Sequence, residues 1–338
     1  MKKVLLTTTA LVAFAGAASA EVTLSGYAEI GLIGGSAAGF ETQFHNDFDV
    51  KFTLSGETDN GLTFGATIDL DEVSGGISNT GNPSAVFISG GFGKITMGDT
   101  DGAFDWAMQE VGIGSALADD HTTHAGFNFN SGLDGLYDGQ VLRYDNTFGD
   151  FGVAVSATLD DSGVGSAAWG VGVKYKAALG GVDLGLGLGY QSGDVVTAAI
   201  AAAVPTAGPD GLDSTLDDTP AVVAVPASVT GSTDVWGVSV DAKFGGGFRA
   251  IVSYSDADVA GFSTTHTGLG LGYTTGALTV SANYGVYNPA VGLDTDGYGL
   301  AVNYDLGGGA VVMAGYGSAS DAGAPSVDTW SVGLGLSF

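Results

Sequence analysis

The sequence predicts an all-β protein, a single sixteen-stranded antiparallel β-barrel that crosses a membrane. Three observations favour this fold. Apolar residues alternate with small or polar residues along most of the chain, tight turns alternate with longer connections, and every Lys and Arg after residue 20 lies on the face opposite the apolar one. Such alternation is typical of strands whose two faces meet lipid and water.

The first twenty residues predict a cleaved secretion signal. A positive start (Lys2, Lys3) precedes mostly apolar residues 4–17, and residues 18–20, Ala-Ser-Ala, have the small side chains of a cleavage site. The apolar stretch is shorter than the roughly 20 residues that a membrane-spanning helix needs. We therefore expect an exported protein whose one domain, the barrel, covers residues 21–338.

The composition narrows the range of functions. The 338 residues include 9 Lys or Arg against 37 Asp or Glu, so the chain repels the phosphates of nucleic acids. It has no cysteine, which excludes disulfides and thiolate chemistry. Although 45% of the residues are apolar, no run after the signal is long enough for a spanning helix. The 59 glycines and 7 prolines favour extended structure with tight turns.

Segments with period-2 alternation, bounded by Gly, Asp, Asn and Ser, are predicted to be strands. We count sixteen of them, and an even number is what a single-chain bacterial barrel requires. The predicted strands lie at about 22–33, 46–57, 61–72, 84–90, 92–100, 140–147, 150–160, 166–177, 181–191, 233–244, 247–256, 264–275, 277–287, 295–306, 309–318 and 327–338.

The connections between these strands alternate in length. Tight-turn sequences such as DNG, GG, FGD and TTGA join alternate pairs, whereas the interleaved connections are generally longer. A barrel with short periplasmic turns and long extracellular loops has this pattern, whereas a soluble β-sandwich has no reason to produce it. Residues 195–229 are predicted to be a surface loop, because their length and Pro205 exclude a spanning helix.

Aromatic and charged residues support the assignment of faces. Aromatic residues of the apolar parity stand at both ends of several strands, as Trp236 and Phe244 do. Strands of this length, rising about 3.3 Å per residue and tilted by about 40°, bring the two aromatics to the edges of a lipid-facing band. A cation at the centre of that band costs roughly 2–4 kcal/mol. The cations that avoid it are Lys51, Lys94, Arg143, Lys174, Lys176, Lys243 and Arg249.

Several segments, taken in order, carry a resemblance to a known family. EVTLSGYAEIG follows the signal, FTLSGETDNGLTFGATIDL and VFISGGFGKITMGDTDGAF precede the third long connection, YDLGGGA precedes the penultimate strand, and the chain ends on Phe338. As a set, they resemble the general porins of alphaproteobacteria of the Rhodobacter and Paracoccus type. The resemblance implies a multi-pass outer-membrane barrel, a homotrimer embedded in outer-membrane lipid, and passive diffusion of ions and small hydrophilic solutes. It implies neither catalysis nor an organic cofactor.

The third long connection, residues 101–139, is implied to fold into the lumen and form a constriction. Its many apolar side chains, Phe104 and Trp106 among them, need a surface to pack on. We expect that surface to be the inner wall, where glycines leave room. The lumen-facing glycines are Gly170, Gly172, Gly185, Gly187, Gly189, Gly268, Gly270 and Gly272.

The resemblance also implies a transverse field, with acidic residues of the loop facing basic residues of the wall. Opposed charges at a narrow aqueous site orient dipolar solutes and bias ions. Because few basic residues are available, we expect a weak preference for cations. The constriction candidates are Glu110, Asp119, Asp120 and Asp105 on the loop, and Arg143, Lys51, Arg249, Lys174 and Lys94 on the wall.

Metal binding in this loop is a further expectation of the sequence. Glu110, Asp119 and Asp120 offer the oxygen ligands that Ca²⁺ prefers, and the resemblance makes a calcium site plausible. His121 and His124 have a spacing that would suit zinc on one face of a helix. For the two histidines, an ordinary polar loop is the favoured interpretation.

The sequence leaves two alternatives to a general diffusion channel. The alternatives are an outer-membrane barrel with solute-specific uptake and one with lipid-hydrolase activity. A G-x-S-x-G motif, which would mark a serine hydrolase of the α/β type, does not occur in the sequence. The terminal Phe338 resembles the recognition signal of outer-membrane proteins, so we expect its deletion to impair assembly.

Overall fold

The computed structural model describes residues 21–37, 40–73, 76–77, 84–118, 122–137, 139–160, 163–197 and 228–338. Its strands are β1 Glu21–Gly35, β2 Gln43–Glu57, β3 Thr63–Val73, β4 Gly76–Ile77, β5 Ser84–Gly90, β6 Gly93–Gly98, β7 Val141–Phe148, β8 Phe151–Thr158, β9 Ala168–Leu179, β10 Val182–Thr197, β11 Ser228–Phe244, β12 Phe248–Val259, β13 Phe262–Thr275, β14 Leu278–Pro289, β15 Thr295–Gly307, β16 Ala310–Ser320 and β17 Val327–Ser337. The short helix α1 spans Ala103–Ala107. The predicted signal at residues 1–20 lies outside the described residues.

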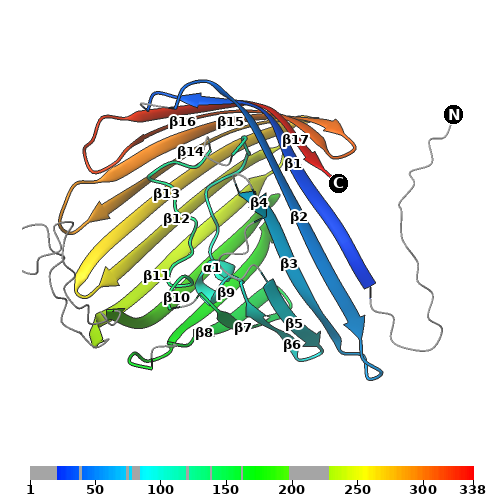
Figure 1. Ribbon diagram of the computed structural model, residues 1–338, viewed down its shortest axis with the longest axis vertical. Helices are drawn as coiled ribbons and strands as arrows, with labels where there is room; N and C mark the ends of the chain where they lie inside the picture. The colour runs from blue at the N-terminus through cyan, green and yellow to red at the C-terminus, as the bar shows by residue number, and fades with distance from the viewer. Residues whose placement is uncertain are drawn as a thin grey trace, which may run out of the picture.

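Sixteen of these strands close into one antiparallel barrel (Figure 1). Each pairs with its neighbour in the chain, except that β3 pairs with β5 and the two-residue β4 lies beside the end of β3. β1 and β17 pair from Tyr27 opposite Ser337 to Gly35 opposite Thr329 and so close the ring. The predicted sixteen-stranded barrel is confirmed.

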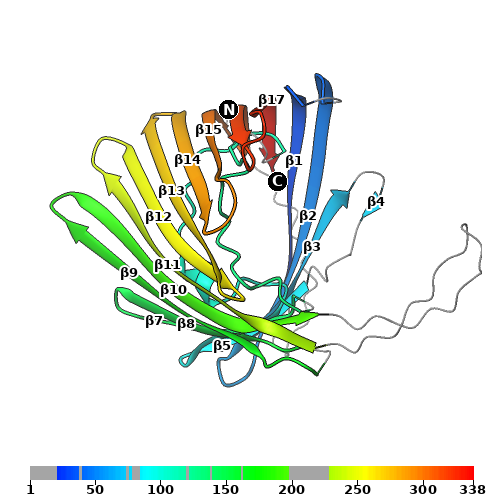
Figure 2. The same cartoon turned by 90° about the vertical axis from the view of Figure 1, so that its left-hand side faces the viewer.

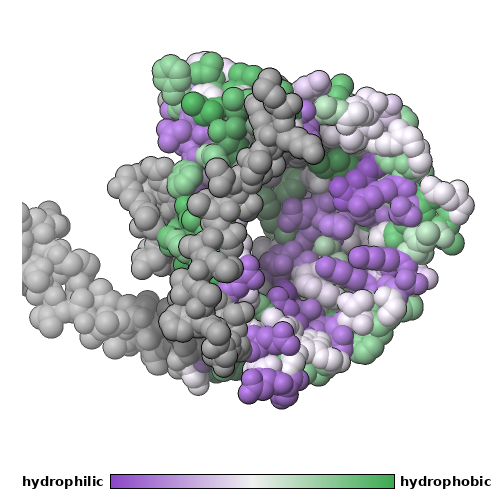
Figure 3. Space-filling view, turned by 90° about the vertical axis from the view of Figure 1, so that its right-hand side faces the viewer, coloured by the Kyte–Doolittle hydropathy of each residue, from purple (hydrophilic) through white to green (hydrophobic). Residues whose placement is uncertain are grey.

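The two faces of each strand differ as the alternation predicts. On β11, Val238 and Val240 are 40% and 37% exposed on the outer surface, whereas the inward Ser239 is 1% exposed. Ser239 is covered by a loop inside the barrel, whose residue Gln109 donates its backbone N–H to the Ser239 hydroxyl. Figure 3 shows hydrophilic residues lining the hollow of the barrel. Among the described residues, no helix is long and apolar enough to cross a membrane.

Glycines form several of the tight turns. Between β9 and β10 the chain reverses through Gly180 and Gly181, both with positive φ, which other residues adopt at a steric cost. On the loop side, β12 and β13 are joined by only Ala260 and Gly261, with φ of 54° and 87°. The sequence predicted a longer loop there, and that prediction is wrong because both strands continue through polar residues.

The strands also extend further than predicted around the proline-bearing connection. β10 continues to Thr197 and β11 begins at Ser228, so both ends of the predicted loop at residues 195–229 are strand. Residues 198–227 lie outside the described residues. β10 and β11 are consequently the longest strands of the sheet.

The barrel wall varies in height. β5 and β6 have 7 and 6 residues, whereas β10 and β11 have 16 and 17. Figure 2 shows the short strands β5, β7 and β8 gathered on one side, below the long strands. A 6-residue strand tilted by about 40° rises about 15 Å, less than the apolar band of about 25 Å.

Candidate functional site: a loop-lined constriction

The connection between β6 and β7 runs inside the barrel and supplies about half of the buried apolar residues that the structure describes. Phe104, Val111, Leu117 and Phe127 are all almost completely buried, and each belongs to this connection. They form three clusters with wall residues, in which Ile33, Met313, Val235 and Ile251 are the buried partners from the strands. The apolar side chains that distinguish this loop in the sequence therefore pack against the inner wall.

The outgoing half of the loop follows the wall around the barrel. Its backbone N–H groups donate hydrogen bonds to polar side chains of the wall. These N–H groups are not part of a helix or sheet, so the wall supplies the acceptors that they need. The pairs, in order, are Ala103 with Ser156 of β8 (2.9 Å), Gln109 with Ser239 of β11 (2.9 Å), Ser115 with Asn303 of β15 (3.1 Å), Leu117 with Ser331 of β17 (3.2 Å) and Ala118 with Glu29 of β1 (2.8 Å).

The returning half runs back along the same wall. The Asn283 amide of β14 donates to the Thr122 carbonyl, and the His266 imidazole of β13 lies 2.9 Å from the Gly126 carbonyl. Near the end of the loop, Leu133 donates its N–H to Gln191 of β10 at 2.7 Å. The two halves thus form a band that narrows the lumen on one side, and the cyan-green trace of Figure 2 follows it.

Glycines in the wall allow this close approach. A Cβ at Gly187 would collide with the Ala107 carbonyl, and one at Gly270 with the Val111 carbonyl. Loop atoms also lie against Gly172, Gly189, Gly268 and Gly272. The remaining two predicted glycines do not contact the loop. Gly170 lies against side chains of the wall, and Gly185 has only Asp241 nearby.

Two of the predicted wall cations contact the start of the loop. Arg143 of β7 is only 8% exposed, donates from Nη1 to the Asp101 carbonyl at 2.5 Å and donates from Nε to Asp145 at 3.1 Å. The Lys174 ammonium of β9 lies 4.2 Å from the centre of the Trp106 ring. These cations hold the loop against the wall, so their charge is directed into protein as well as into the lumen.

The other three predicted cations have partners on the wall itself. Lys51 of β2 bonds Asp69 of β3 at 2.9 Å. Arg249 of β12 makes two hydrogen bonds to Asp241 of β11, at 2.8 and 3.0 Å. The Lys94 ammonium lies 4.5 Å from the centre of the Phe87 ring. Cross-strand carboxylates therefore offset part of the basic charge that the sequence assigns to the wall.

Burial affects two of the loop acids, Asp105 and Asp134. Asp105 lies on α1, and burial raises its pKa to about 7, with the carboxylates of Asp101, Asp134 and Glu110 adding to the rise and Lys174 opposing it. Burial also raises the pKa of Asp134. Asp119, Asp120 and the neighbouring His121 lie outside the described residues. Because Asp105 carries a partial charge near neutrality, it contributes less field than an ordinary aspartate.

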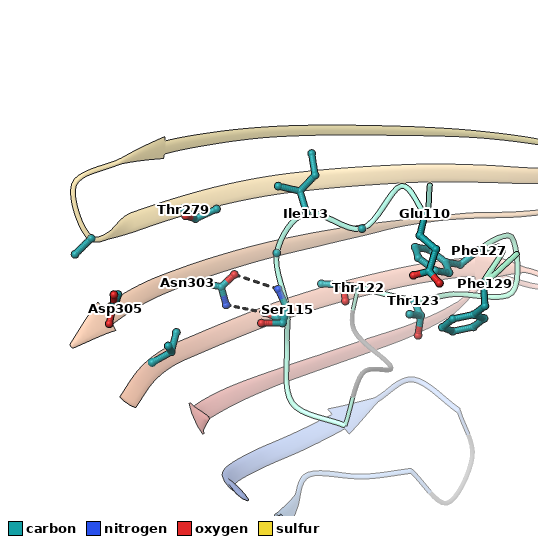
Figure 4. A pocket seen from close by; sticks show the side chains of 14 residues that line it. Glu110, Ile113, Ser115, Thr122, Thr123, Phe127, Phe129, Thr279, Asn303 and Asp305 are labelled. Atoms are coloured by element: carbon teal, nitrogen blue, oxygen red, sulfur yellow. Dashed lines mark hydrogen bonds between the residues drawn. The ribbon is translucent and has the colours of Figure 1, made fainter. Parts of the chain in front are cut away.

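Glu110 lies on the band and lines a cavity of about 560 Å³ between the loop and strands β14 to β16. Figure 4 shows its carboxylate directed toward the returning half of the loop, where Thr123 and Phe129 lie. The opposite end of the cavity is polar, with Asn303 and Asp305 of β15. Asn303 holds Ser115 through both its amide nitrogen and its oxygen.

Residues 7–324 match the family model of Gram-negative porins. The chain belongs to this family. Over 301 residues it is 31% identical to a porin of Rhodobacter capsulatus, a match that covers 87% of this chain and 93% of the relative.

Solved porin structures agree with the fold. One porin structure, refined at 1.8 Å, matches with a TM-score of 0.64 at 24% identity. The match covers 94% of this chain and 100% of the chain of that porin. An anion-selective porin from Comamonas acidovorans matches with a TM-score of 0.61 at 16% identity, covering 95% and 100%. As a porin, the chain forms a water-filled diffusion channel of the Gram-negative outer membrane, and the predicted resemblance is confirmed.

Apart from Arg143 and Lys174, the wall residues that position the loop were not among the sequence-predicted site residues. Glu29 accepts hydrogen bonds from the Ala118 N–H and the Tyr27 hydroxyl, and it contacts His45 at 2.9 Å. His124, considered above as a zinc ligand, lies 2.9 Å from the Asn283 amide oxygen instead. The signal in the sequence is a polar residue on the inward parity of a strand centre, as Ser239 is in GVSVDAKF.

Proposed function

We propose that this porin is a general diffusion channel whose size limit is set by the loop band and which weakly prefers cations. The observation that carries the proposal is the attachment of the loop to the wall, from Ser156 of β8 around to Glu29 of β1. A loop held flat against the wall narrows the lumen without filling it. Ions and small hydrophilic solutes then pass down their gradients, and the width and charge of the constriction select among them.

Charge balance supports the preference for cations. The chain carries 37 Asp or Glu against 9 Lys or Arg, and the described wall cations Lys51, Arg143 and Arg249 each pair with an aspartate. An excess of carboxylate at a narrow aqueous site raises the local concentration of cations. Salt screens this effect over about 10 Å at 0.1 M, so the preference declines as the ionic strength rises.

A homotrimer is part of the proposal, and the low side of the barrel supports it. Strands β5 to β8 are too short to cover the apolar band by themselves. Their outward side chains are apolar, with Val86, Met97 and Leu142 exposed. Contact with neighbouring copies would cover this side of the barrel, where the strands are shorter than the apolar layer of the membrane.

Calcium at Glu110, Asp119 and Asp120 stays a prediction. Glu110 lines an open cavity, and the other two residues lie outside the described part of the chain. Titration of the detergent-solubilised protein with Ca²⁺, followed by calorimetry, tests it directly. Heat that saturates in wild type and is lost in Glu110→Gln would support the site.

Reconstitution into a planar bilayer tests the proposed function. We expect stepwise increases in current, grouped in threes if trimers insert, and a reversal potential in a salt gradient with the sign of mild cation selectivity. Pure protein that inserts into the bilayer without conductance steps would overturn the diffusion channel. Steps with anion selectivity would overturn only the proposed ion preference.

A further inference from the structure

Basic residues are confined to one part of the barrel. No Lys or Arg follows Arg249 in the sequence, and none lies between residue 21 and Lys51. Strands β13 to β17 and β1 therefore form a wall without a cation, which we call the base-free wall. Apart from histidine and tyrosine, its ionisable side chains are carboxylates, so a solute that moves along it meets no Lys or Arg of the wall.

Two adjoining cavities lie between the base-free wall and the loop. The first, of about 560 Å³, includes Glu110 of the loop and Asp305 of β15. The second, of about 460 Å³, includes Phe40 and Asp321, the latter beyond the end of β16. Among the described residues that line them, neither cavity has a Lys or Arg, so their formal charge is negative.

Phe129 links the two cavities, because it and Thr123 line both. The Phe129 ring packs edge-on against Phe127, with the ring centres 4.9 Å apart, and it stays 53% exposed in an aqueous lumen. A half-exposed aromatic ring retains apolar surface that a solute can cover. Its face also attracts cations, by about 0.5–1 kcal/mol at exposed sites.

The remaining lining complements a solute with an apolar end and a charged end. Ile113 and Phe127 give the first cavity an apolar side, while Thr279 and Asn303 supply hydrogen-bonding groups. Figure 4 shows the Glu110 carboxylate on the same side of this cavity as Phe129. A carboxylate near an aromatic ring is the combination that recognises an organic ammonium ion.

From this geometry we propose that the two cavities form a transit site for organic cations that carry an apolar group. Such a solute passes from Asp321 past Phe129 to Glu110 and Asp305, and it pauses where the ring and the Glu110 carboxylate meet. The inference rests on the proposed function and deepens it by naming a class of solute. It predicts that organic cations interrupt the ion current as they cross.

The test is current block in a planar bilayer by benzyltrimethylammonium, with benzyl alcohol as the neutral probe and tetramethylammonium as the cation without a ring. We expect benzyltrimethylammonium to block at the lowest concentration. Glu110→Gln should weaken that block about fivefold, because one unit charge is lost. Phe129→Leu should weaken it about threefold, because the ring face is lost.

Asp183→Asn serves as the matched control, because Asp183 lines a comparable cavity of about 630 Å³ that also holds Lys176 and Lys243. Benzyltrimethylammonium should block Asp183→Asn and wild type equally. Equal block of wild-type channels by the neutral probe, or unchanged block in both Glu110→Gln and Phe129→Leu, would overturn the transit site. Each variant's conductance is recorded first without probe, so a failure of the channel itself is seen separately.

Discussion

Asp105 is the loop carboxyl whose charge changes with pH near neutrality. Burial and three neighbouring carboxylates raise its pKa to about 7, so protons bind below that pH and leave above it. With such a pKa the group is about nine-tenths ionised at about pH 8 and about one-tenth ionised at about pH 6.

We therefore predict that cation selectivity decreases as the pH falls from about 8 to about 6. The reversal potential in a salt gradient measures this change. Asp105→Asn should remove much of the pH dependence in that range, whereas Asp183→Asn, at the start of β10, should retain it. A wild-type selectivity that stays constant across this range would contradict the raised pKa.

For single residues, the sequence predicts which face of the barrel a side chain lies on better than it predicts which residues it contacts. The inward placement of the seven cations follows from parity alone, because apolar neighbours on both sides fix the face. The partners do not follow, because Lys51 and Asp69 meet only through the register of β2 and β3. Register depends on turn geometry and on strand ends, which are the least certain features of a sequence-based assignment.

The loop and the glycines beneath it form the element that sets the channel's width. We predict that Gly270→Val changes the single-channel conductance, because the added side chain would occupy the place of the Val111 backbone. Gly185→Val is the matched control, since Gly185 also faces the lumen but has only Asp241 within contact distance. The current steps of both variants, recorded in the same bilayer and salt, give the measurement.

Unchanged conductance in Gly270→Val would argue against the packing of the loop backbone on the wall glycines. A change of equal size in Gly185→Val would point to a general effect of side chains in the lumen instead. Because both substitutions add the same side chain to an inward strand position, their cost in strand propensity is similar.

The inward fold of this element was predictable from its apolar side chains, but its path around the wall was not. The loop follows whichever wall positions offer an acceptor, and those are single residues such as Ser156, Ser239 and Ser331 on distant strands. Nothing in the local sequence of the loop encodes these contacts. Short-range patterns likewise missed α1 and the two-residue turn at Ala260.

The whole molecule depends on closing one sheet between its first and last strands. The Phe338 N–H donates to the Gly26 carbonyl at 2.9 Å, and the Phe338 ring is exposed on the outer surface. An unpaired strand edge in lipid leaves backbone groups without partners, at a cost of several kcal/mol per group. The sixteen strands and their closure were predictable because alternation, turn chemistry and strand number all agree.

We predict that deletion of Phe338 lowers the amount of assembled protein in the outer membrane several-fold, while the channels that do assemble keep their conductance. Phe248→Ala is a suitable control, since this residue is also an exposed outer aromatic at the turn side of a strand. Quantification of the folded, heat-modifiable band in outer-membrane fractions measures assembly. Equal losses in the two variants would mean that any missing aromatic has this effect.

The central claim is that the wall-bound loop, rather than the barrel, limits the size of passing solutes. The most direct measurement is the size cut-off for neutral polyethylene glycols in single-channel recordings, compared between wild type and a variant with residues 104–133 replaced by a short Gly-Ser linker. The linker can close the gap because the Gly102 N–H already bonds the Asp134 carboxylate at 2.6 Å. We predict that the variant has a larger conductance and admits larger polymers; an unchanged cut-off would contradict this account.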